Sequence, residues 1–235
     1  MKALLKIKPE KGLTLMDGPD PKPGPCDVLI RVKATSLCGT DAHIYNWDEW
    51  ASHRVHLPRI IGHEMFGEVV EVGTEVSTIN VGDRVAAESH LTCGLCFQCR
   101  TCQAHVCKNY RILGIDFDGS YAEYVSLPER VLWKTAPDLP PELGCLHEPL
   151  GNAVDAALAE DLTGHTVLVT GCGPTGLFAI AVARTAGAAQ IIATDISEYR
   201  LQLATQLGAD HVFNANTLSP GALGAALSDL MGGEG

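Results

Sequence analysis

The amino-acid sequence predicts an α/β plus β fold, in which a mostly β domain is followed by a nucleotide-binding α/β domain. Valine-rich runs interrupted by glycine occupy the first half, strand and helix patterns alternate in the second half, and a glycine-rich turn joins the first such strand to its helix. Valine-rich runs with close glycines favour a small, strongly curved antiparallel barrel, and the alternation favours a parallel sheet. We therefore expect two domains, 1–150 and 151–235.

The first domain should consist of short strands. Apolar and charged residues alternate over 28–34, as a half-buried strand requires. A proline-rich connector over 135–150 closes this domain. The other expected strands are 3–7, 66–73, 81–85, 119–127 and 131–133.

The second domain has the pattern of one half of a doubly wound sheet. Segment 166–170 is an apolar run of the kind found in buried parallel strands. Two further strands are expected at 191–195 and 211–214. The expected helices are 152–158, 177–187 and 198–207.

Composition excludes several classes of function. The 235 residues carry a formal net charge of −11, which argues against nucleic acid and anionic membrane surfaces as partners. Neither a secretory leader pattern nor an apolar run of about 18 residues is present, so we expect a cytoplasmic protein. Nine cysteines in that setting indicate metal ligands and buried thiols.

The first candidate metal site is a stretch that opens with Cys38 and closes with His63 and Glu64. One soft and two harder ligands suit a zinc ion that keeps one position open for substrate. The alternative is a buried structural cysteine and a hydrogen-bonded core histidine. On a regular strand His63 and Glu64 would face opposite sides, so both reach one ion only if the chain bends at Gly62. Glu148 is the alternative carboxylate ligand.

A second candidate metal site is a loop with closely spaced cysteines, Cys93, Cys96, Cys99 and Cys107. Four thiolates at this spacing can hold one tetrahedral zinc ion with no open position, which stabilises the loop. Disulfides are the alternative, and the expected cytoplasmic setting disfavours them. Cys102 is a fifth cysteine in the loop; it is either a bystander or a competitor for the metal.

The glycine-rich turn predicts a dinucleotide site. Gly171, Gly173 and Gly176 form G-x-G-x-x-G between a strand and a helix, and Asp195 ends the next strand. The glycines allow the backbone to approach a pyrophosphate at the helix N-terminus. Asp195 can accept hydrogen bonds from both ribose hydroxyls and would repel a 2′-phosphate, so NAD is preferred over NADP. The alternative is an ordinary strand–turn–helix junction.

Together these features resemble the zinc-dependent medium-chain dehydrogenases, over the whole chain. The most specific match is CGTDAHIYNWDEWA at 38–51, whose paired tryptophans are typical of the branch that oxidises L-threonine and not of alcohol or polyol dehydrogenases. Further matches are 62–64, 88–90, the cysteine loop, 148–154 and 198–201. The resemblance implies a GroES-like barrel, a Rossmann domain, one catalytic and one structural Zn²⁺ per subunit, NAD and a homotetramer.

The resemblance also implies roles for single residues. Zinc held by Cys38, His63 and a carboxylate lowers the pKa of the substrate hydroxyl, and hydride passes to NAD, which gives 2-amino-3-oxobutanoate from L-threonine. Thr40 and His43 match the family's proton relay, and His90 matches a histidine that senses the substrate. The remaining matched cofactor positions are Pro174, Thr175 and Arg200.

The sequence departs from the family pattern in two places. Asp155 stands where the family usually has histidine, and the family continues well beyond residue 235, with its fourth nucleotide-binding strand expected to begin at 232–235. We therefore expect a partial chain that keeps the adenosine end of the NAD site without turning over threonine. The competing functions are a polyol or secondary-alcohol dehydrogenase and a non-catalytic zinc- and nucleotide-binding fragment.

Overall fold

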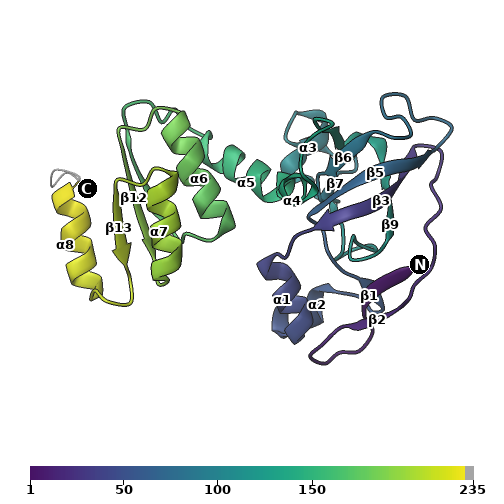
Figure 1. Cartoon of the computed structure of the whole chain (residues 1–235), viewed down its shortest axis with the longest axis horizontal. Helices are drawn as coiled ribbons and strands as arrows, with labels where there is room; N and C mark the ends of the chain where they lie inside the picture. The colour runs from purple at the N-terminus through teal and green to yellow at the C-terminus, as the bar shows by residue number, and fades with distance from the viewer. Residues whose placement is uncertain (231–235) are drawn as a thin grey trace. The chain divides into compact units, whose positions relative to one another are not determined.

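A computed structural model describes residues 1–230 of the chain. The chain divides into two compact units, Met1–Glu148 and Pro149–Gly235 (Figure 1). The division lies inside helix α5 (His147–Ala157), close to the expected boundary after residue 150. The strand expected at 232–235 lies outside the described residues. Within residues 1–230, no helix is both long and apolar enough to cross a membrane.

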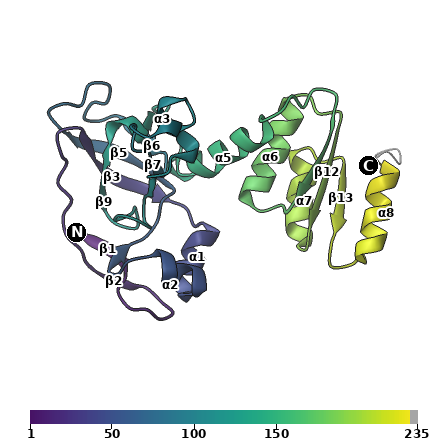
Figure 2. The ribbon, with the colours of Figure 1, turned by 180° about the vertical axis from the view of Figure 1, so that it is seen from behind.

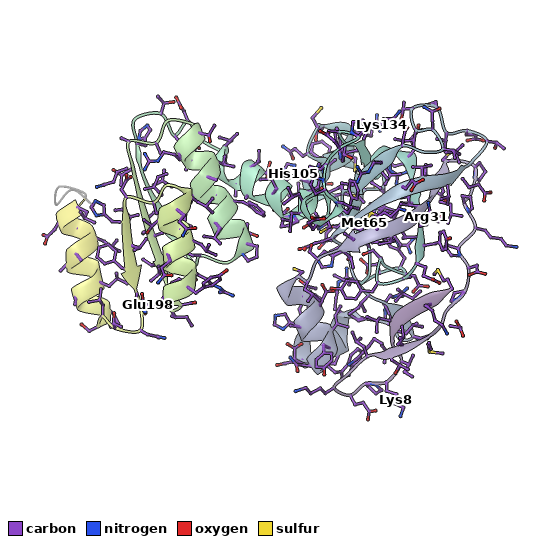
Figure 3. The ribbon with its side chains drawn as sticks, in the orientation of Figure 1. Lys8, Arg31, Met65, His105, Lys134 and Glu198 are labelled. Atoms are coloured by element: carbon purple, nitrogen blue, oxygen red, sulfur yellow. The ribbon has the colours of Figure 1, made fainter. Side chains whose placement is uncertain are left out.

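The first unit is built on a five-stranded antiparallel sheet in the order β10-β6-β5-β3-β9. Along β3, Val28 and Ile30 are buried and Arg31 is exposed, which confirms the alternation read from the sequence. Figure 3 marks Arg31 on β3 and Met65 on the neighbouring β5, where Met65 is buried. The strands are β3 (Asp27–Thr35), β5 (Met65–Val72), β6 (Arg84–Ala87), β9 (Tyr124–Pro128) and β10 (Leu132–Lys134).

A second antiparallel sheet has the order β2-β1-β4, and its strands are β1 (Lys2–Lys6), β2 (Thr14–Asp17) and β4 (Arg59–Ile60). Lys6 at the end of β1 is fully buried. Its ammonium donates to the carbonyl oxygens of Gly12 and Tyr45, each at 3.0 Å, and also to that of Glu10. A buried charge is tolerated only when it is hydrogen-bonded in this way, so Lys6 ties the N-terminal strand to the end of helix α1.

Several segments of the first unit differ from the sequence-based expectation. The stretch after Cys38 forms two short helices, α1 (Gly39–Asn46) and α2 (Glu49–Arg54), for which no helix was expected. Expected strand 81–85 begins at Arg84, because the preceding residues form a turn. The strand expected at 119–127 is also shorter, because residues 119–123 are irregular and β9 begins at Tyr124.

The smaller elements of the first unit are β7 (His90–Leu91) paired with β8 (Arg111–Ile112), α3 (Phe97–Arg100), two 3₁₀ turns (Ala104–Val106 and Glu129–Val131) and α4 (Pro141–Gly144).

The second unit contains a parallel three-stranded sheet in the order β11-β12-β13, which confirms the expected βαβαβ arrangement. Helices α6 and α7 lie side by side on one face of this sheet, as the views from both sides show (Figures 1 and 2). Their buried residues, such as Ile180 and Leu201, pack with Ile191 of β12. The elements are β11 (Thr166–Thr170), α6 (Pro174–Thr185), β12 (Gln190–Asp195), α7 (Glu198–Leu207), β13 (His211–Asn214) and α8 (Pro220–Leu230).

Candidate metal centre and nucleotide site

Cys38, His63 and Glu64 form one group, in which one ligand atom of each lies within 4.8 Å of the others. Cys38 caps the N-terminus of α1, and the other two residues precede β5. The bend expected at Gly62 is present: its φ is 92°, and a Cβ atom there would lie 2.1 Å from the ring of Tyr121. Only glycine combines this φ with such a close contact, so Gly62 allows two adjacent side chains to reach the same group.

Asp41 lies next to Cys38 and His63 of this group. One oxygen of its buried carboxylate accepts hydrogen bonds from the Cys38 N–H at 3.0 Å and the Tyr121 hydroxyl at 2.9 Å. The other oxygen faces Nδ1 of His63 at 3.9 Å, and both of these buried atoms lack a hydrogen-bond partner. A carboxylate behind one imidazole nitrogen directs the other nitrogen to a metal. The residues therefore fit a metal ion bound by Cys38, His63 and Glu64.

The pKa values of the three side chains respond to burial and to one another. The hydrogen bond to His63 lowers the pKa of the Cys38 thiol, which favours the thiolate that metals bind. Burial lowers the pKa of His63, but the hydrogen bond to Cys38 and the charge of Asp41 outweigh it and raise that pKa to about 9. Burial raises the pKa of Glu64. Binding of a metal ion would release the proton from His63 and lower the cost of keeping the buried Glu64 carboxylate ionised.

Glu148 lies in a different group, with Glu88 and His90. Ser89 is fully buried and its hydroxyl donates to a Glu148 carboxylate oxygen at 2.9 Å. Nδ1 of His90 lies 2.9 Å from a Glu88 oxygen, and this hydrogen bond raises the pKa of His90. The geometry thus favours Glu64 over Glu148 as the carboxylate beside Cys38.

Thr40 and His43 both lie on α1, three residues apart and so on one face of the helix. The Thr40 hydroxyl lies 3.6 Å from the sulfur of Cys38, beside the candidate metal ligands. The His43 side chain is 57% exposed, and its Nδ1 contacts the carboxylate of Asp48. The two residues therefore extend from the metal-ligand group to solvent.

The sulfurs of Cys93, Cys96, Cys99 and Cys107 form a single group within 4.8 Å. The sulfur of Cys96 lies 3.5 Å from that of Cys99 and 3.7 Å from that of Cys107, and the sulfurs of Cys93 and Cys107 are 3.6 Å apart. Tetrahedral zinc with Zn–S bonds of about 2.3 Å requires sulfurs about 3.8 Å apart, so the loop is preorganised for such an ion. Backbone N–H groups of Leu95 and Cys96 lower the pKa of Cys93 to about 6. Cys102 lies outside this group and is exposed.

In the second unit, the turn from Gly171 to Gly176 joins β11 to the N-terminus of α6. Gly171 has a φ of 92°, and a Cβ atom on Gly176 would lie 1.9 Å from the Gly171 carbonyl oxygen. Pro174 begins the helix, and Thr175 follows in its first turn, where N–H groups have no partner within the helix. This turn can therefore accept a phosphate.

Asp195 ends β12 and is buried against this turn. Its two carboxylate oxygens accept hydrogen bonds from the N–H groups of Cys172 at 2.7 Å and Ser197 at 2.8 Å. Burial raises the pKa of Asp195, but these N–H groups outweigh burial and lower it. Arg200 lies 3.9 Å from the carboxylate and is half exposed. Asp195 thus holds the turn in place.

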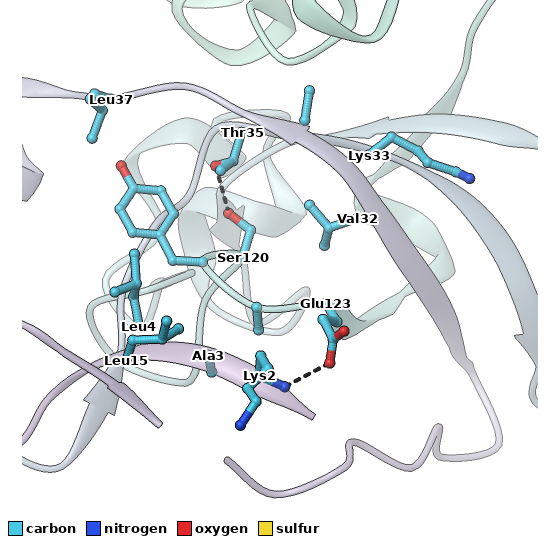
Figure 4. A pocket seen from close by; sticks show the side chains of 13 residues that line it. Lys2, Ala3, Leu4, Leu15, Val32, Lys33, Thr35, Leu37, Ser120 and Glu123 are labelled. Atoms are coloured by element: carbon cyan, nitrogen blue, oxygen red, sulfur yellow. Dashed lines mark hydrogen bonds between the residues drawn. The ribbon is translucent and has the colours of Figure 1, made fainter. Parts of the chain in front are cut away.

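A hollow of about 580 Å³ lies between β1, β3 and residues 120–123 (Figure 4). A hydrogen bond of 3.2 Å between Thr35 and Ser120 crosses it, and the Lys2 N–H donates to Glu123 at its rim. None of the residues in the two candidate metal groups lines it, so it is not the site of the proposed chemistry.

Two residues that contact candidate site residues were missed by the sequence reasoning: Asp41, beside Cys38, and Asp48, beside His43. Asp41 follows Cys38 by three residues and bonds back to its N–H, which is the spacing of a helix capping pair. Asp48 accepts from the Ala51 N–H and so caps α2. Both are aspartates at the start of a helix, a pattern that sequence inspection can detect.

Comparison with known protein families supports the same class of protein. Residues 24–138 match the model for the alcohol dehydrogenase GroES-like domain, and residues 174–235 match the model for zinc-binding dehydrogenases. A solved NAD-dependent alcohol dehydrogenase is 31% identical with a TM-score of 0.88, over 100% of this chain and 68% of that one. Galactitol-1-phosphate dehydrogenase from Escherichia coli is 27% identical with a TM-score of 0.86, over 98% of this chain and 66% of that one. The chain belongs to the zinc-binding alcohol dehydrogenase family.

Within that family, the curated relatives with high identity are L-threonine 3-dehydrogenases. The protein of that name from Pyrococcus furiosus is 52% identical over 91% of this chain, and that from Symbiobacterium thermophilum is 52% identical over 94%. The Shewanella frigidimarina protein is 48% identical over 92% of this chain. The chain spans 62%, 63% and 64% of the length of these three relatives.

Proposed function

We propose that the whole protein oxidises the β-hydroxyl group of L-threonine to a ketone, producing 2-amino-3-oxobutanoate and NADH. The observation that carries this proposal is the Cys38–His63–Glu64 group in a chain that is about half identical to L-threonine 3-dehydrogenases. We further propose that residues 1–150 form the catalytic domain and 151–235 part of the NAD-binding domain, in a cytoplasmic homotetramer.

We infer that Cys38, His63 and Glu64 hold a catalytic zinc ion, and that the four-cysteine group holds a structural one. A zinc ion supplies a Lewis acid at the substrate hydroxyl, and NAD supplies the acceptor for hydride. Asp41 orients His63, since its free oxygen faces Nδ1 of that ring. The four-cysteine group has a complete set of sulfur ligands and therefore supports the fold of its loop rather than the reaction.

The proton of the substrate hydroxyl leaves through Thr40 and His43. The Thr40 hydroxyl can both accept and donate a hydrogen bond, and it lies beside the Cys38 sulfur. An imidazole takes up and releases protons near neutral pH, and His43 is largely exposed to solvent. Their order along α1 supports this direction of transfer.

The Glu88–His90–Glu148 group supports an amino acid as substrate. Carboxylate oxygens bind an ammonium group and an imidazolium binds a carboxylate, through charge-assisted hydrogen bonds. The raised pKa of His90, which its hydrogen bond to Glu88 causes, favours the charged ring. A simple alcohol or a polyol carries neither charged group, so it could not form these charge-assisted hydrogen bonds.

The test is a substrate comparison with purified whole protein and NAD. We expect kcat/KM for L-threonine to exceed that for sorbitol and 2-butanol by at least about a hundred-fold, because the neutral substrates cannot form charge-assisted hydrogen bonds with the charged groups of the site. NADH formation is followed by absorbance and the ketone product by mass spectrometry. Faster turnover of sorbitol or 2-butanol than of L-threonine would assign the protein to the polyol and alcohol branch.

Cofactor choice gives a second expected result, on Asp195→Ala. The variant should bind NAD more weakly and discriminate less against NADP, by about 1–3 kcal/mol for a lost charge-assisted hydrogen bond. Calorimetry with each dinucleotide measures both Kd values. Because Asp195 also accepts from the N–H groups of Cys172 and Ser197, Asp195→Asn is the milder variant: it keeps one of the two oxygen acceptors and loses the charge. If the ratio of the Kd for NADP to the Kd for NAD is the same in both variants as in the natural sequence, Asp195 does not set the preference for NAD.

A further inference from the structure

We propose that Asp48 is a positioning residue for His43: its carboxylate keeps a proton on Nδ1 of the imidazole, so that Nε2 is the nitrogen that exchanges protons. This inference rests on the proposed function, in which His43 passes the substrate proton to solvent. It assigns a role to Asp48, the first of the two acidic residues between Trp47 and Trp50.

The carboxylate of Asp48 is held by two partners, one for each oxygen. One oxygen accepts from the N–H of Ala51 at 3.0 Å, which makes Asp48 the N-cap of α2. The other oxygen contacts Nδ1 of His43. Since Ala51 is fully buried, the cap anchors the carboxylate to the fold, and the carboxylate in turn fixes the ring.

The junction between α1 and α2 also restrains the same ring. Trp50 lies against His43, with ring centroids 5.9 Å apart and planes inclined by 58°. Trp47 takes the left-handed conformation that ends α1, with a φ of 55°. Lys6 lies 5.3 Å from the Trp47 ring centre and donates to the Tyr45 carbonyl oxygen. The helix end that carries His43 is therefore anchored to strand β1.

An ionised carboxylate accepts hydrogen bonds and donates none. The N–H of Ala51, with a smaller effect of His43, lowers the pKa of Asp48, so the carboxylate is ionised at neutral pH. Nδ1 of His43 must then be the donor, and Nε2 of the neutral ring keeps its lone pair. Among residues 1–230, Asp48 is the ionisable side chain within hydrogen-bond or ion-pair distance of this ring.

The deciding variant is Asp48→Asn in the whole protein. The asparagine oxygen can still accept from the Ala51 N–H, because asparagine is as good an N-cap as aspartate. Its amide nitrogen then faces Nδ1 and donates to it, which forces the ring proton onto Nε2. An imidazole in this tautomer cannot accept a proton at Nε2. The reversal of the tautomer, rather than a loss of folding, should stop proton transfer.

We expect ¹⁵N NMR of histidine-labelled protein, with His43 assigned by its absence in His43→Gln, to show Nδ1–H in the natural sequence and Nε2–H in Asp48→Asn. The kcat for L-threonine should fall by about 10²–10⁴-fold in that variant, while the melting temperature and the Kd for NAD stay unchanged. Asp48→Ser keeps the cap without facing the ring, so it should give a mixture of tautomers and an intermediate kcat.

Glu49→Gln is the matched control, since it removes a neighbouring exposed carboxylate that makes no hydrogen bond to His43; its tautomer and kcat should equal those of the natural sequence. An Nε2–H ring in the natural sequence overturns the proposal. So does an Asp48→Asn variant whose kcat is unchanged, whichever tautomer it shows. If the natural protein does not oxidise threonine, the proposed function fails, while the tautomer measurement still decides whether Asp48 sets the protonation of His43.

Discussion

Cys38→Ser in the whole protein is expected to lose one equivalent of zinc and to lower kcat/KM for L-threonine by more than about a thousand-fold. A catalytic metal ion contributes several kcal/mol of transition-state stabilisation, and about 4 kcal/mol corresponds to a thousand-fold in rate. Serine offers a hydroxyl in place of the thiolate that zinc prefers. Because serine is a favoured N-cap residue, helix α1 should persist and the loss should not reflect unfolding.

Zinc analysis by mass spectrometry and steady-state kinetics measure both quantities. Cys26→Ser is the matched control, because Cys26 is exposed, lies outside both metal groups and donates a side-chain hydrogen bond to Glu75. That control should retain zinc and activity. A Cys38→Ser protein with full zinc content and full turnover would remove Cys38 from the site.

Cys96→Ser should also lose about one equivalent of zinc, but with a different consequence. The four-sulfur group has no open position for substrate, and the binding energy of a structural zinc ion is folding energy. Cys96 is buried and lies within 3.7 Å of two other sulfurs. We expect the melting temperature to fall by about 5 °C or more, and the loop around residues 93–107 to become sensitive to proteolysis.

Cys102→Ser is the matched control for this prediction, since Cys102 lies in the same loop but is exposed and outside the sulfur group. It should leave zinc content and melting temperature unchanged. If instead Cys102→Ser loses the metal and Cys96→Ser retains it, the ligand set must be reassigned. Acidification should release this zinc from the natural sequence, because protons compete with the ion for the thiolates.

Local patterns were sufficient for much of the fold. The alternation over 28–34 predicted the buried Val28 and Ile30, and the apolar run at 166–170 predicted the first parallel strand. Helices α1 and α2 were not predicted, because each is short and contributes few buried residues, so that no amphipathic period marks it. Their starts depend on single hydrogen bonds, from the N–H groups of Cys38 and Ala51 to aspartates.

The sequence by itself determined the ligand types and the loops that carry them: the evenly spaced cysteines, and the glycine turn followed by an acidic residue. Tertiary structure alone decided which distant residues meet. Strands β3 and β5 are antiparallel with Thr35 opposite Met65, so the chain just after β3 lies beside the chain just before β5, and Cys38 meets His63. Tertiary structure likewise favours Glu64 over Glu148 as the carboxylate beside Cys38. The number of residues between two side chains in the sequence does not tell how far apart they lie in the folded chain.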